Sequence, residues 1–393
     1  MARSTFHGPA FFSYGFRPFF LGASLFAGLA IPAWVLIFSA EGTAPFLYPP
    51  REWHVHEMLF GFLPAIITGF LLTAIPNWTG RAPVRGTPLI FLWALWLAGR
   101  LAIAIPWSVP LVPAVIDGAF LVAVAGMVWR IMAASGNLAL VPMGVLVSLY
   151  AVANILFHAL ALSGAETDLA ARMTLAVVML LLSFIGGRVA PNFTREFVVR
   201  ERLTERPAPF SRFDVAALVL VAVAAVAWVA APQAHAAGGA LVTAGTVHVV
   251  RLLRWRGWVT WKESLVLILH VGYGWLAMAL LALGGASFEL GLKATDAVHA
   301  LTAGAVGAMT LGVMTRASLG HTGRPLHAGP QAVAIYTLVN LGALLRVFGP
   351  AAGLPTDLML SLAAAGWSGA YLLFALFFGP ILVRPSVDAS VDE

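Results

Sequence analysis

The chain has 393 residues, of which 60% are hydrophobic and 10% are charged, with a formal net charge of +6. A mean hydropathy of +0.90 excludes a soluble globular protein, because apolar stretches of about 18 or more residues are typical of membrane-spanning helices. The chain contains no cysteine, which excludes disulfides, iron–sulfur clusters and thiolate metal sites. A bound metal must therefore use histidine, methionine, carboxylate or backbone oxygen.

Apolar stretches follow one another along the whole chain and predict an all-α integral membrane protein, a single polytopic domain over residues 1–393. Because each stretch approaches the roughly 20 residues that cross a bilayer, we expect twelve transmembrane helices. They lie at roughly 19–39, 57–75, 88–106, 110–131, 140–162, 171–189, 214–231, 234–253, 264–284, 297–315, 331–348 and 357–380.

The basic residues of the connecting loops are unevenly distributed. Eighteen fall on one side of the predicted membrane and three, Arg51, Arg172 and Lys293, on the other. Because cytoplasmic loops carry the excess of lysine and arginine, we expect both termini in the cytoplasm. These short loops also account for the sequence pI near 10.2, so we expect the lipid bilayer and no nucleic acid as a partner.

Similar turns follow three of the stretches, each four helices apart: Trp78–Arg81, Asn192–Arg195 and His321–Arg324. His56 precedes Trp78 by 22 residues, and His299 precedes His321 by the same 22. This spacing favours three four-helix units at 1–139, 140–256 and 257–393. Such units are similar to the three arcs of the catalytic subunit of haem–copper oxidases. The alternative is a common loop sequence that recurs by chance.

The segment Trp53–Phe62 places His54, His56 and Glu57 at the start of the second stretch. Ionisable side chains at a membrane are costly and mark candidate functional sites. Residues i and i+2 of a helix point about 200° apart. The two histidines therefore serve two metals from opposite faces, or one metal if the turn is unwound. We expect Glu57 to act as a catalytic proton relay; the alternative is a polar cap at the membrane interface.

Two further histidines, His248 and His270, lie in the inner halves of the eighth and ninth stretches. A short basic loop joins these stretches, so we expect the two helices to be adjacent. Histidines at matching depth on neighbouring helices are suited to bind a low-spin haem b, either together or with one of them binding alone. The alternative is a hydrogen bond from each ring to a carbonyl of the next helix.

The outer boundary carries more candidates. His158 and His299 join the two histidines of the second stretch there as expected metal ligands. Arg100 and Arg346, in the outer parts of the third and eleventh stretches, need anionic partners because an unpaired arginine is costly in a membrane. Haem propionates fit the guanidinium fork, which makes both arginines candidate cofactor-binding residues. Asp117 or Glu57 would fit equally well.

Several motifs together resemble the NnrS family, in order from the first stretch to the eleventh: Phe16–Leu21, Trp53–Phe62, Gly69–Ala74, Trp78–Gly80, Ile185–Val189, Leu269–His270, His299–Thr302 and Ser318–Pro325. Proteins of that family are described as polytopic membrane proteins containing haem and copper, associated with the nitric oxide response of denitrifying and related bacteria. The resemblance implies haem b and copper as cofactors, nitric oxide as a partner and a location in the bacterial inner membrane. It does not fix the reaction.

The expectation is therefore a haem- and copper-binding membrane protein that binds nitric oxide and reduces it, an oxidoreductase that protects against nitrosative stress. Because a covalent haem-attachment motif is not found in the chain, electrons must come from quinol or from a separate redox protein. The alternative is a non-catalytic protein, either a nitric oxide sensor or scavenger, or a carrier of haem or copper. A reductase needs two coupled redox centres, whereas a carrier needs a path and a labile site.

Overall fold

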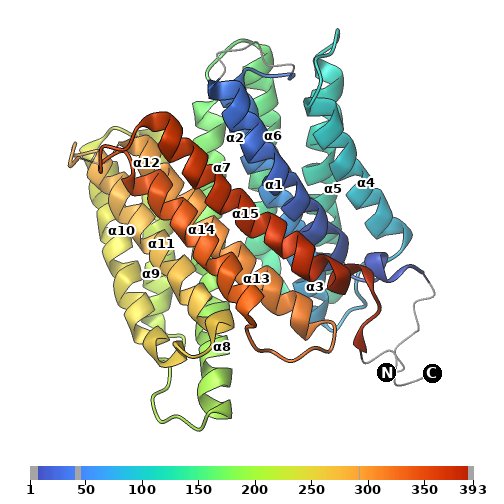
Figure 1. Cartoon of the computed structure of the whole chain (residues 1–393), viewed down its shortest axis with the longest axis vertical. Coiled ribbons are helices and arrows are strands. Elements are labelled where there is room, and N and C mark those ends of the chain that lie inside the picture. Colours follow the sequence, from blue (N-terminus) through green and yellow to red (C-terminus); the bar gives the residue numbers. More distant parts are fainter. Residues whose placement is uncertain (1–7, 40–45, 292, 388–393) are drawn as a thin grey trace. The chain divides into compact units, whose positions relative to one another are not determined.

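The computed structural model describes residues 8–39, 46–291 and 293–387, and nearly all of them are helical (Figure 1). The longer helices and the π-helical segments between them are α1 (Phe16–Ser39), α2 (Pro50–His56), η2 (Glu57–Phe62), α3 (Leu63–Thr79), α4 (Thr87–Ile103), α5 (Leu111–Ser135), α6 (Val141–Leu162), α7 (Asp168–Leu181), η4 (Leu182–Gly186), α8 (Gly187–Arg200), α9 (Arg212–Ala230), α10 (His235–Arg254), α11 (Ser264–Ala286), α12 (Ala294–His299), η6 (Ala300–Val306), α13 (Gly307–Gly320), α14 (Pro330–Phe348) and α15 (Thr356–Val383).

Membrane-spanning length is common among these helices. Over the described residues, 11 helices are long and apolar enough to cross a bilayer. The helix α4, with 17 residues, is a shorter apolar helix at the place of the third predicted stretch. The expectation of an all-α polytopic membrane protein is therefore confirmed. The two termini, which we expect in the cytoplasm, lie outside the described residues.

The chain divides into two compact units. Unit 1 comprises Met1–Thr174, Ala317–Arg324 and Ala375–Glu393, and unit 2 comprises Leu175–Arg316 and Pro325–Phe374. In unit 1, α5 packs against both α4 and α6; in unit 2, α10 packs against both α9 and α11 (Figure 1). The adjacency of α10 and α11 agrees with the expectation for the eighth and ninth stretches. The three four-helix units expected from the repeat stay a prediction.

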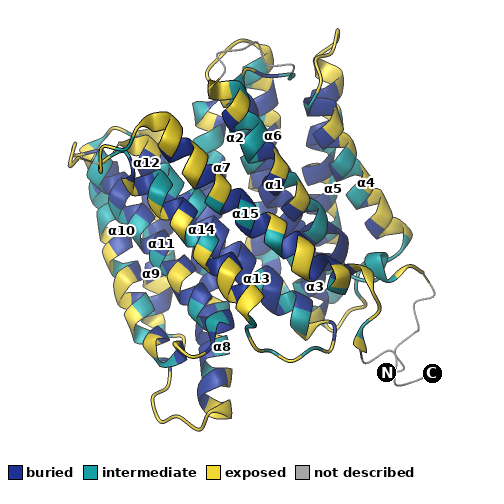
Figure 2. Ribbon diagram, viewed as in Figure 1, coloured by how far each residue is buried: buried dark blue, intermediate teal, exposed yellow. Residues whose placement is uncertain are grey.

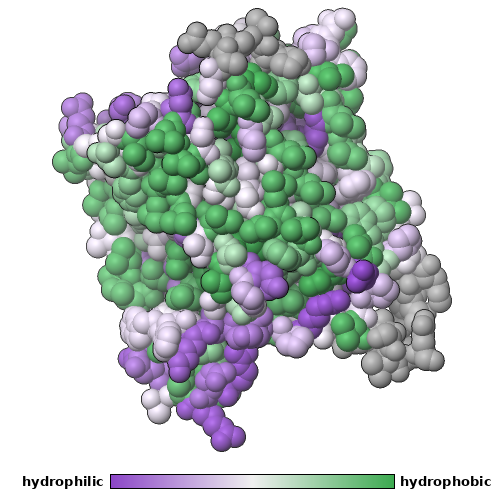
Figure 3. Space-filling model, viewed as in Figure 1, coloured by the Kyte–Doolittle hydropathy of each residue, from purple (hydrophilic) through white to green (hydrophobic). Residues whose placement is uncertain are grey.

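The faces of the helices are sorted by what they contact. On α9, Val215, Val219, Val223 and Val226 are exposed, whereas Ala217, Val221, Ala224, Ala225 and Trp228 are buried. The exposed valines recur every three or four residues and so form one stripe. Figure 2 shows such stripes along many of the helices, and Figure 3 shows apolar residues over the helical walls, with hydrophilic residues gathered beyond the end of α8. Apolar stripes exposed to this extent are suited to lipid.

Three of the long helices contain a π-helical segment: η2, η4 and η6 interrupt the continuous helices Pro50–Thr79, Asp168–Arg200 and Ala294–Gly320. A π-helical turn replaces the usual hydrogen bonds by i→i+5 bonds and is frequent at functional sites. In two of these segments, side chains from other helices donate hydrogen bonds to backbone carbonyls. Trp96 Nε1 donates to the Gly61 carbonyl at 2.8 Å, and Arg251 Nη1 donates to the Ser183 carbonyl at 2.9 Å. The first segment begins directly after His56.

Candidate metal centre

Five ionisable side chains meet at one end of unit 1: His56, Glu57, Arg100, Asp117 and His158. We call this group the unit 1 centre. The topology brings them together, because α2 and α5 begin at this end of the unit and α4 and α6 finish there. No member is more than 5% exposed. Such burial of charged groups requires that they pair with one another or with a bound cation.

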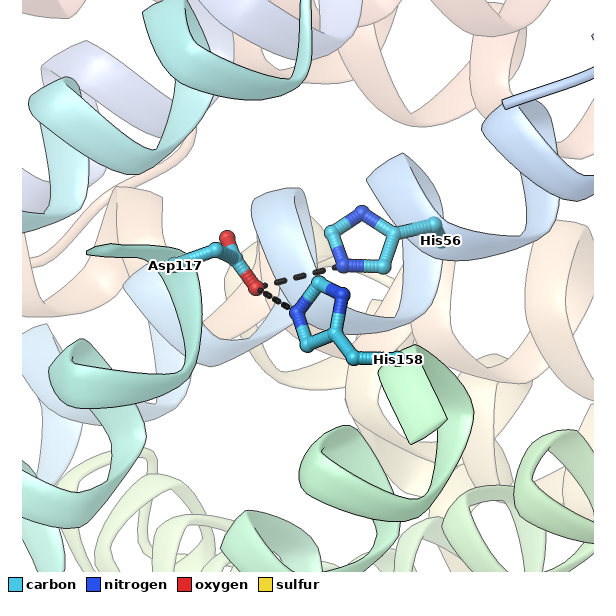
Figure 4. A group of neighbouring side chains, drawn as sticks. All are labelled: His56, Asp117 and His158. Carbon is cyan, nitrogen blue, oxygen red and sulfur yellow. Dashed lines mark hydrogen bonds and ion pairs between the residues drawn. The ribbon is translucent and has the colours of Figure 1, made fainter. Parts of the chain in front are cut away.

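The carboxylate of Asp117 lies between two imidazoles. Its Oδ2 atom is 3.2 Å from Nε2 of His56 and 2.9 Å from Nε2 of His158. Figure 4 shows the two rings reaching this oxygen from α2 and α6 while the aspartate comes from α5. One donor atom from each residue lies within 4.8 Å of the other two, as required of atoms that could hold one metal ion. Two nitrogens and one oxygen are a donor set that first-row transition metals accept.

Glu57 and Arg100 complete the charge pattern. The Nδ1 atom of His56 lies 3.0 Å from Oε1 of Glu57, and the Arg100 guanidinium pairs with Glu57 through one terminal nitrogen and with Oδ1 of Asp117 through the other. A carboxylate on the far nitrogen of a metal-binding imidazole fixes the tautomer and the orientation of the ring. The pairing of Arg100 matches the carboxylate alternative in the sequence analysis.

Two glycines make room for these contacts. A Cβ atom at Gly61 would fall on the Arg100 guanidinium, and a Cβ at Gly99 would lie 3.0 Å from Oδ1 of Asp117. The backbones of η2 and α4 therefore approach the charged groups as only glycine permits. Gly61 belongs to the π-helical segment, so the local widening of this helix and the missing side chain both serve the same ion pair.

The formal charges of the unit 1 centre do not cancel. Two carboxylates face one guanidinium, which leaves one negative charge if both imidazoles are neutral. In addition, both nitrogens of His56 face carboxylate oxygens, and both can donate only if each carries a proton. A protonated imidazole satisfies both conditions. A metal ion on Nε2, with the Nδ1 proton directed to Glu57, satisfies them as well.

Two neutral side chains extend the network. The Tyr48 hydroxyl lies 2.6 Å from Nδ1 of His158 and donates to it when Nε2 carries the imidazole proton. Burial raises the pKa of Tyr48, and the carboxylates of Asp117 and Glu57 raise it further, so the phenol keeps its proton. Asn154 Nδ2 donates to Oδ2 of Asp117 at 3.1 Å.

The remaining histidine of the second stretch lies elsewhere. His54 stacks on Trp34 with ring centroids 4.2 Å apart. His56, two residues later, points into the unit 1 centre. This divergence is what the angle between residues i and i+2 of a helix requires.

The two inner histidines of unit 2 are engaged in hydrogen bonds. His248 Nδ1 lies 2.8 Å from the Ala244 carbonyl and its Nε2 lies 2.7 Å from Ser183 Oγ. His270 Nε2 lies 2.7 Å from Thr194 Oγ1. Its Nδ1 faces Gly257, where a Cβ atom would come within 2.5 Å. An axial haem ligand must present a ring nitrogen to the iron. Three of these four ring nitrogens are hydrogen-bonded, whereas the fourth, Nδ1 of His270, is buried and has no hydrogen-bond partner among the described residues.

His299, the fourth outer histidine, has a different pattern of hydrogen bonds. His299 Nδ1 lies 2.7 Å from the Thr295 carbonyl, and among the described residues no hydrogen bond to its Nε2 is recorded. A backbone carbonyl on Nδ1 orients an imidazole for binding through Nε2. One turn earlier on the same helix, Asp296 Oδ1 pairs with Arg346 Nη1 at 2.9 Å. Arg346 thus has a carboxylate partner within the chain, as Arg100 does.

Sequence reasoning missed three members of the network. It considered Asp117 only as a partner for arginine and did not consider Asn154 or Tyr48. A signal existed for Asn154, because it precedes His158 by four residues on α6 and so shares its face. Tyr48 lies near α6 because the loop before α2 brings it there, although Tyr48 and His158 are 110 residues apart in the sequence. A contact of this kind has no local sequence signature.

The fold and the site define a class: helical membrane proteins that hold a buried centre of histidines and carboxylates at one end of a group of helices. The comparison with family models gives the family. Residues 10–386, nearly the whole chain, match the model described as NnrS protein. The chain belongs to the NnrS family, which confirms the resemblance seen in its motifs. A comparison with curated proteins gave no match.

Proposed function

We propose that this protein binds nitric oxide at a metal held by the unit 1 centre and reduces it. The observation that carries the proposal is the buried group of donor atoms from His56, Asp117 and His158, all within 4.8 Å of one another. Three protein ligands leave coordination positions for a small molecule. Nitric oxide is small and uncharged, so burial in a membrane protein does not prevent its access.

Joining two nitric oxide molecules into nitrous oxide and water consumes two electrons and two protons. When bound, a redox metal supplies the position for nitric oxide and accepts electrons, which we expect from quinol or a redox protein. Glu57 holds the proton on Nδ1 of His56, so that Nε2 is the nitrogen available as a ligand. Arg100 occupies Oδ1 of Asp117 and leaves Oδ2 for the metal. Glu57 also stays our proposed proton relay.

The family resemblance implies copper and haem b. Imidazole nitrogens and a carboxylate oxygen are donors that copper accepts, so the unit 1 centre fits such a metal. For haem, the geometry favours Nε2 of His299 and Nδ1 of His270, which have no hydrogen-bond partner among the described residues, over His248, whose two ring nitrogens are both hydrogen-bonded. A haem propionate would have to share Arg346 with Asp296.

The alternative function is a sensor, a scavenger or a carrier of haem or copper. A carrier must release its cargo and therefore needs an accessible site. The side chains of His56, Asp117 and His158 are at most 6% exposed. This burial supports a retained metal over a transported one.

We also propose the threefold repeat and the orientation. The π-helical segments η2, η4 and η6 occur in the helices that match the second, sixth and tenth predicted stretches, which supports three related four-helix units. The excess of basic residues in alternate loops supports cytoplasmic termini in a bacterial inner membrane. With this orientation the unit 1 centre lies toward the outer side.

The test uses His158→Ala, which removes one donor from α6, in purified protein reconstituted in lipid nanodiscs. We expect loss of metal from this centre and loss of nitric oxide binding, measured by elemental analysis and by anaerobic titration with a nitric oxide electrode. His235→Ala, at the start of α10 beside Phe288, is the matched control and should behave as the unmodified protein. Unchanged metal content and nitric oxide binding in His158→Ala would refute the proposal.

A further inference from the structure

We propose that the end of unit 1 opposite the unit 1 centre binds a quinol, which packs against Tyr14 and Phe16 and donates a hydrogen bond to His321. We call these three residues the His321 cluster. The inference rests on the proposed function, because it assigns a site to the electron donor. Two sequence motifs that the unit 1 centre does not use, Phe16–Leu21 and Ser318–Pro325, meet in this cluster.

The His321 cluster lies at a boundary of the membrane-spanning helices. His321 directly follows the last residue of α13, and Phe16 is the first residue of α1. The Phe16 N–H donates to Oγ1 of Thr73 at 3.2 Å. Thr73 follows His56 on one continuous helix, and the 17 residues between their positions correspond to about 25 Å along a helix axis. A quinol, which has an apolar tail and a polar ring, reaches such a boundary from the lipid.

Three rings form the cluster. The imidazole of His321 stacks on Tyr14 with ring centroids 6.4 Å apart and planes 19° apart, and it lies tilted beside Phe16 at 5.6 Å. Phe16 is fully buried, Tyr14 is half-buried and His321 is exposed. The cluster is therefore an aromatic surface with one open side. Aromatic rings attract one another in offset-stacked and tilted arrangements, so the planar ring of a quinol extends this surface.

The polar atoms of the cluster have no recorded use within the protein. Among the described residues, no hydrogen bond is found for either ring nitrogen of His321 or for the Tyr14 hydroxyl. Desolvation by neighbouring atoms lowers the pKa of His321, so the imidazole is neutral at pH 7 and one ring nitrogen accepts a hydrogen bond. A quinol hydroxyl is the matching donor, and the Tyr14 hydroxyl can bond to the quinol as well.

The backbone on both sides of the cluster is held in place. A Cβ atom at Gly15 would lie 2.6 Å from the Leu72 side chain on α3, so this segment approaches α3 closely. The Thr322 carbonyl accepts from the Val387 N–H at 3.0 Å, which fixes the turn after His321. A surface ordered in advance pays less entropy when a ligand binds.

The nearest buried cation favours an uncharged ligand. Arg17, next to Phe16, is 1% exposed. Its Nη1 donates to three carbonyls at and just beyond the end of α15, and its Nη2 donates to Ser386 Oγ at 3.1 Å. Because both terminal nitrogens are engaged, Arg17 is not free to bind a phosphate, and a neutral quinol suits the cluster better than an anionic head group does.

A quinol carries the reducing equivalents that the proposed reaction consumes. Oxidation of one quinol to the quinone breaks two O–H bonds and releases two electrons and two protons. The imidazole of His321 accepts the first proton from the hydroxyl that it binds, and the second passes to water at the open side. Two nitric oxide molecules take up two electrons and two protons in forming nitrous oxide and water. One quinol is thus oxidised for each nitrous oxide formed.

The first experiment locates the ligand without nitric oxide. Full-length protein in detergent is irradiated with a short-chain azidoquinone, and the labelled peptides are identified by mass spectrometry. We expect label at Tyr14–Phe16 or at His321, and about 10-fold less in His321→Phe, which keeps a ring but removes the hydrogen bond. His235→Phe is the matched control, because His235 is exposed and its ring lies 5.2 Å from Phe288; it should be labelled as the unmodified protein is. Label only at other segments, or undiminished label in His321→Phe, would overturn the proposal.

The second experiment measures anaerobic nitric oxide consumption with two donors, a short-chain quinol and a chemical reductant with a soluble mediator. In His321→Phe the KM for the quinol should rise about 10-fold, whereas the rate with the chemical reductant should fall much less. Equal losses with both donors would mean a structural role and would overturn the proposal, as would an unchanged KM. Consumption with neither donor by unmodified protein that still takes up the quinone label at the cluster would refute the proposed function and support the binding site.

Discussion

Replacing Arg100 by methionine removes the guanidinium that, among the described residues, pairs with both carboxylates of the unit 1 centre. Glu57 and Asp117 would remain, each with a side chain 1% exposed. At an effective dielectric constant of about 20, two unit charges about 4 Å apart attract each other by about 4 kcal/mol, part of which offsets desolvation. Breaking a buried pair by removing one partner costs about 3–5 kcal/mol. We expect Arg100→Met to lower the free energy of unfolding by about this amount.

The assay is denaturant unfolding of the purified protein in detergent, with Arg346→Met as the comparison. Arg346 forms one ion pair with Asp296, and the two side chains are 18% and 8% exposed. This pair is partly open to solvent, so we expect a smaller loss, about 1–2 kcal/mol. Adding Glu57→Gln to Arg100→Met should restore part of the stability, because one stranded charge disappears. An Arg100→Met variant no less stable than Arg346→Met would refute the reasoning.

Three further predictions concern the neighbours of this centre. Tyr48→Phe removes the hydroxyl bonded to His158 and should weaken metal binding by about 10-fold, measured by metal titration; unchanged affinity would contradict it. Gly61→Ala places a methyl group on a guanidinium and should destabilise the protein, whereas Gly126→Ala, where the added atom meets nothing within 4 Å, should not; equal thermal stability of the two would disprove the packing argument. Glu57→Gln should lower metal affinity about 10-fold if the carboxylate orients His56. Full metal content together with slow anaerobic nitric oxide consumption would instead support the proton-relay role alone.

The helices were predictable because a bilayer leaves few choices. Backbone groups in lipid must bond within their own helix, so an apolar stretch such as 214–231 fixes the corresponding helix α9 with little help from tertiary contacts. The helix α4 was harder to predict. It ends at Ile103, three residues before the expected end of the stretch. The π-helical segments were not predicted at all, because their sequences are as apolar as the α-helices around them.

The site was predictable only in part. An ionisable residue at a membrane boundary is conspicuous, and His56, Glu57 and His158 were candidates for that reason. Which of them meet depends on helix packing, and His158 is 102 residues from His56 in the sequence. The sequence indicated Asp117 as a possible partner for an outer arginine but did not indicate which other side chains it would face. The inner histidines, His248 among them, illustrate the converse, since depth alone does not indicate whether a ring nitrogen is available.

The π-helical segment η2 also determines the direction in which the His56 side chain points, because it sets the rotation of α2 about the helix axis relative to α3. Each residue of an α-helix advances the chain by about 100° around the axis. Loss of one residue within Glu57–Phe62 that restored a regular α-helix would turn α2 by about that angle relative to α3. Since α3 packs against α1 and α5, the rotation would fall on the α2 side, and His56 would swing away from Asp117. A one-residue deletion in this segment would therefore affect the unit 1 centre more selectively than most substitutions. It redirects the imidazole of His56 and leaves the composition of the segment almost unchanged.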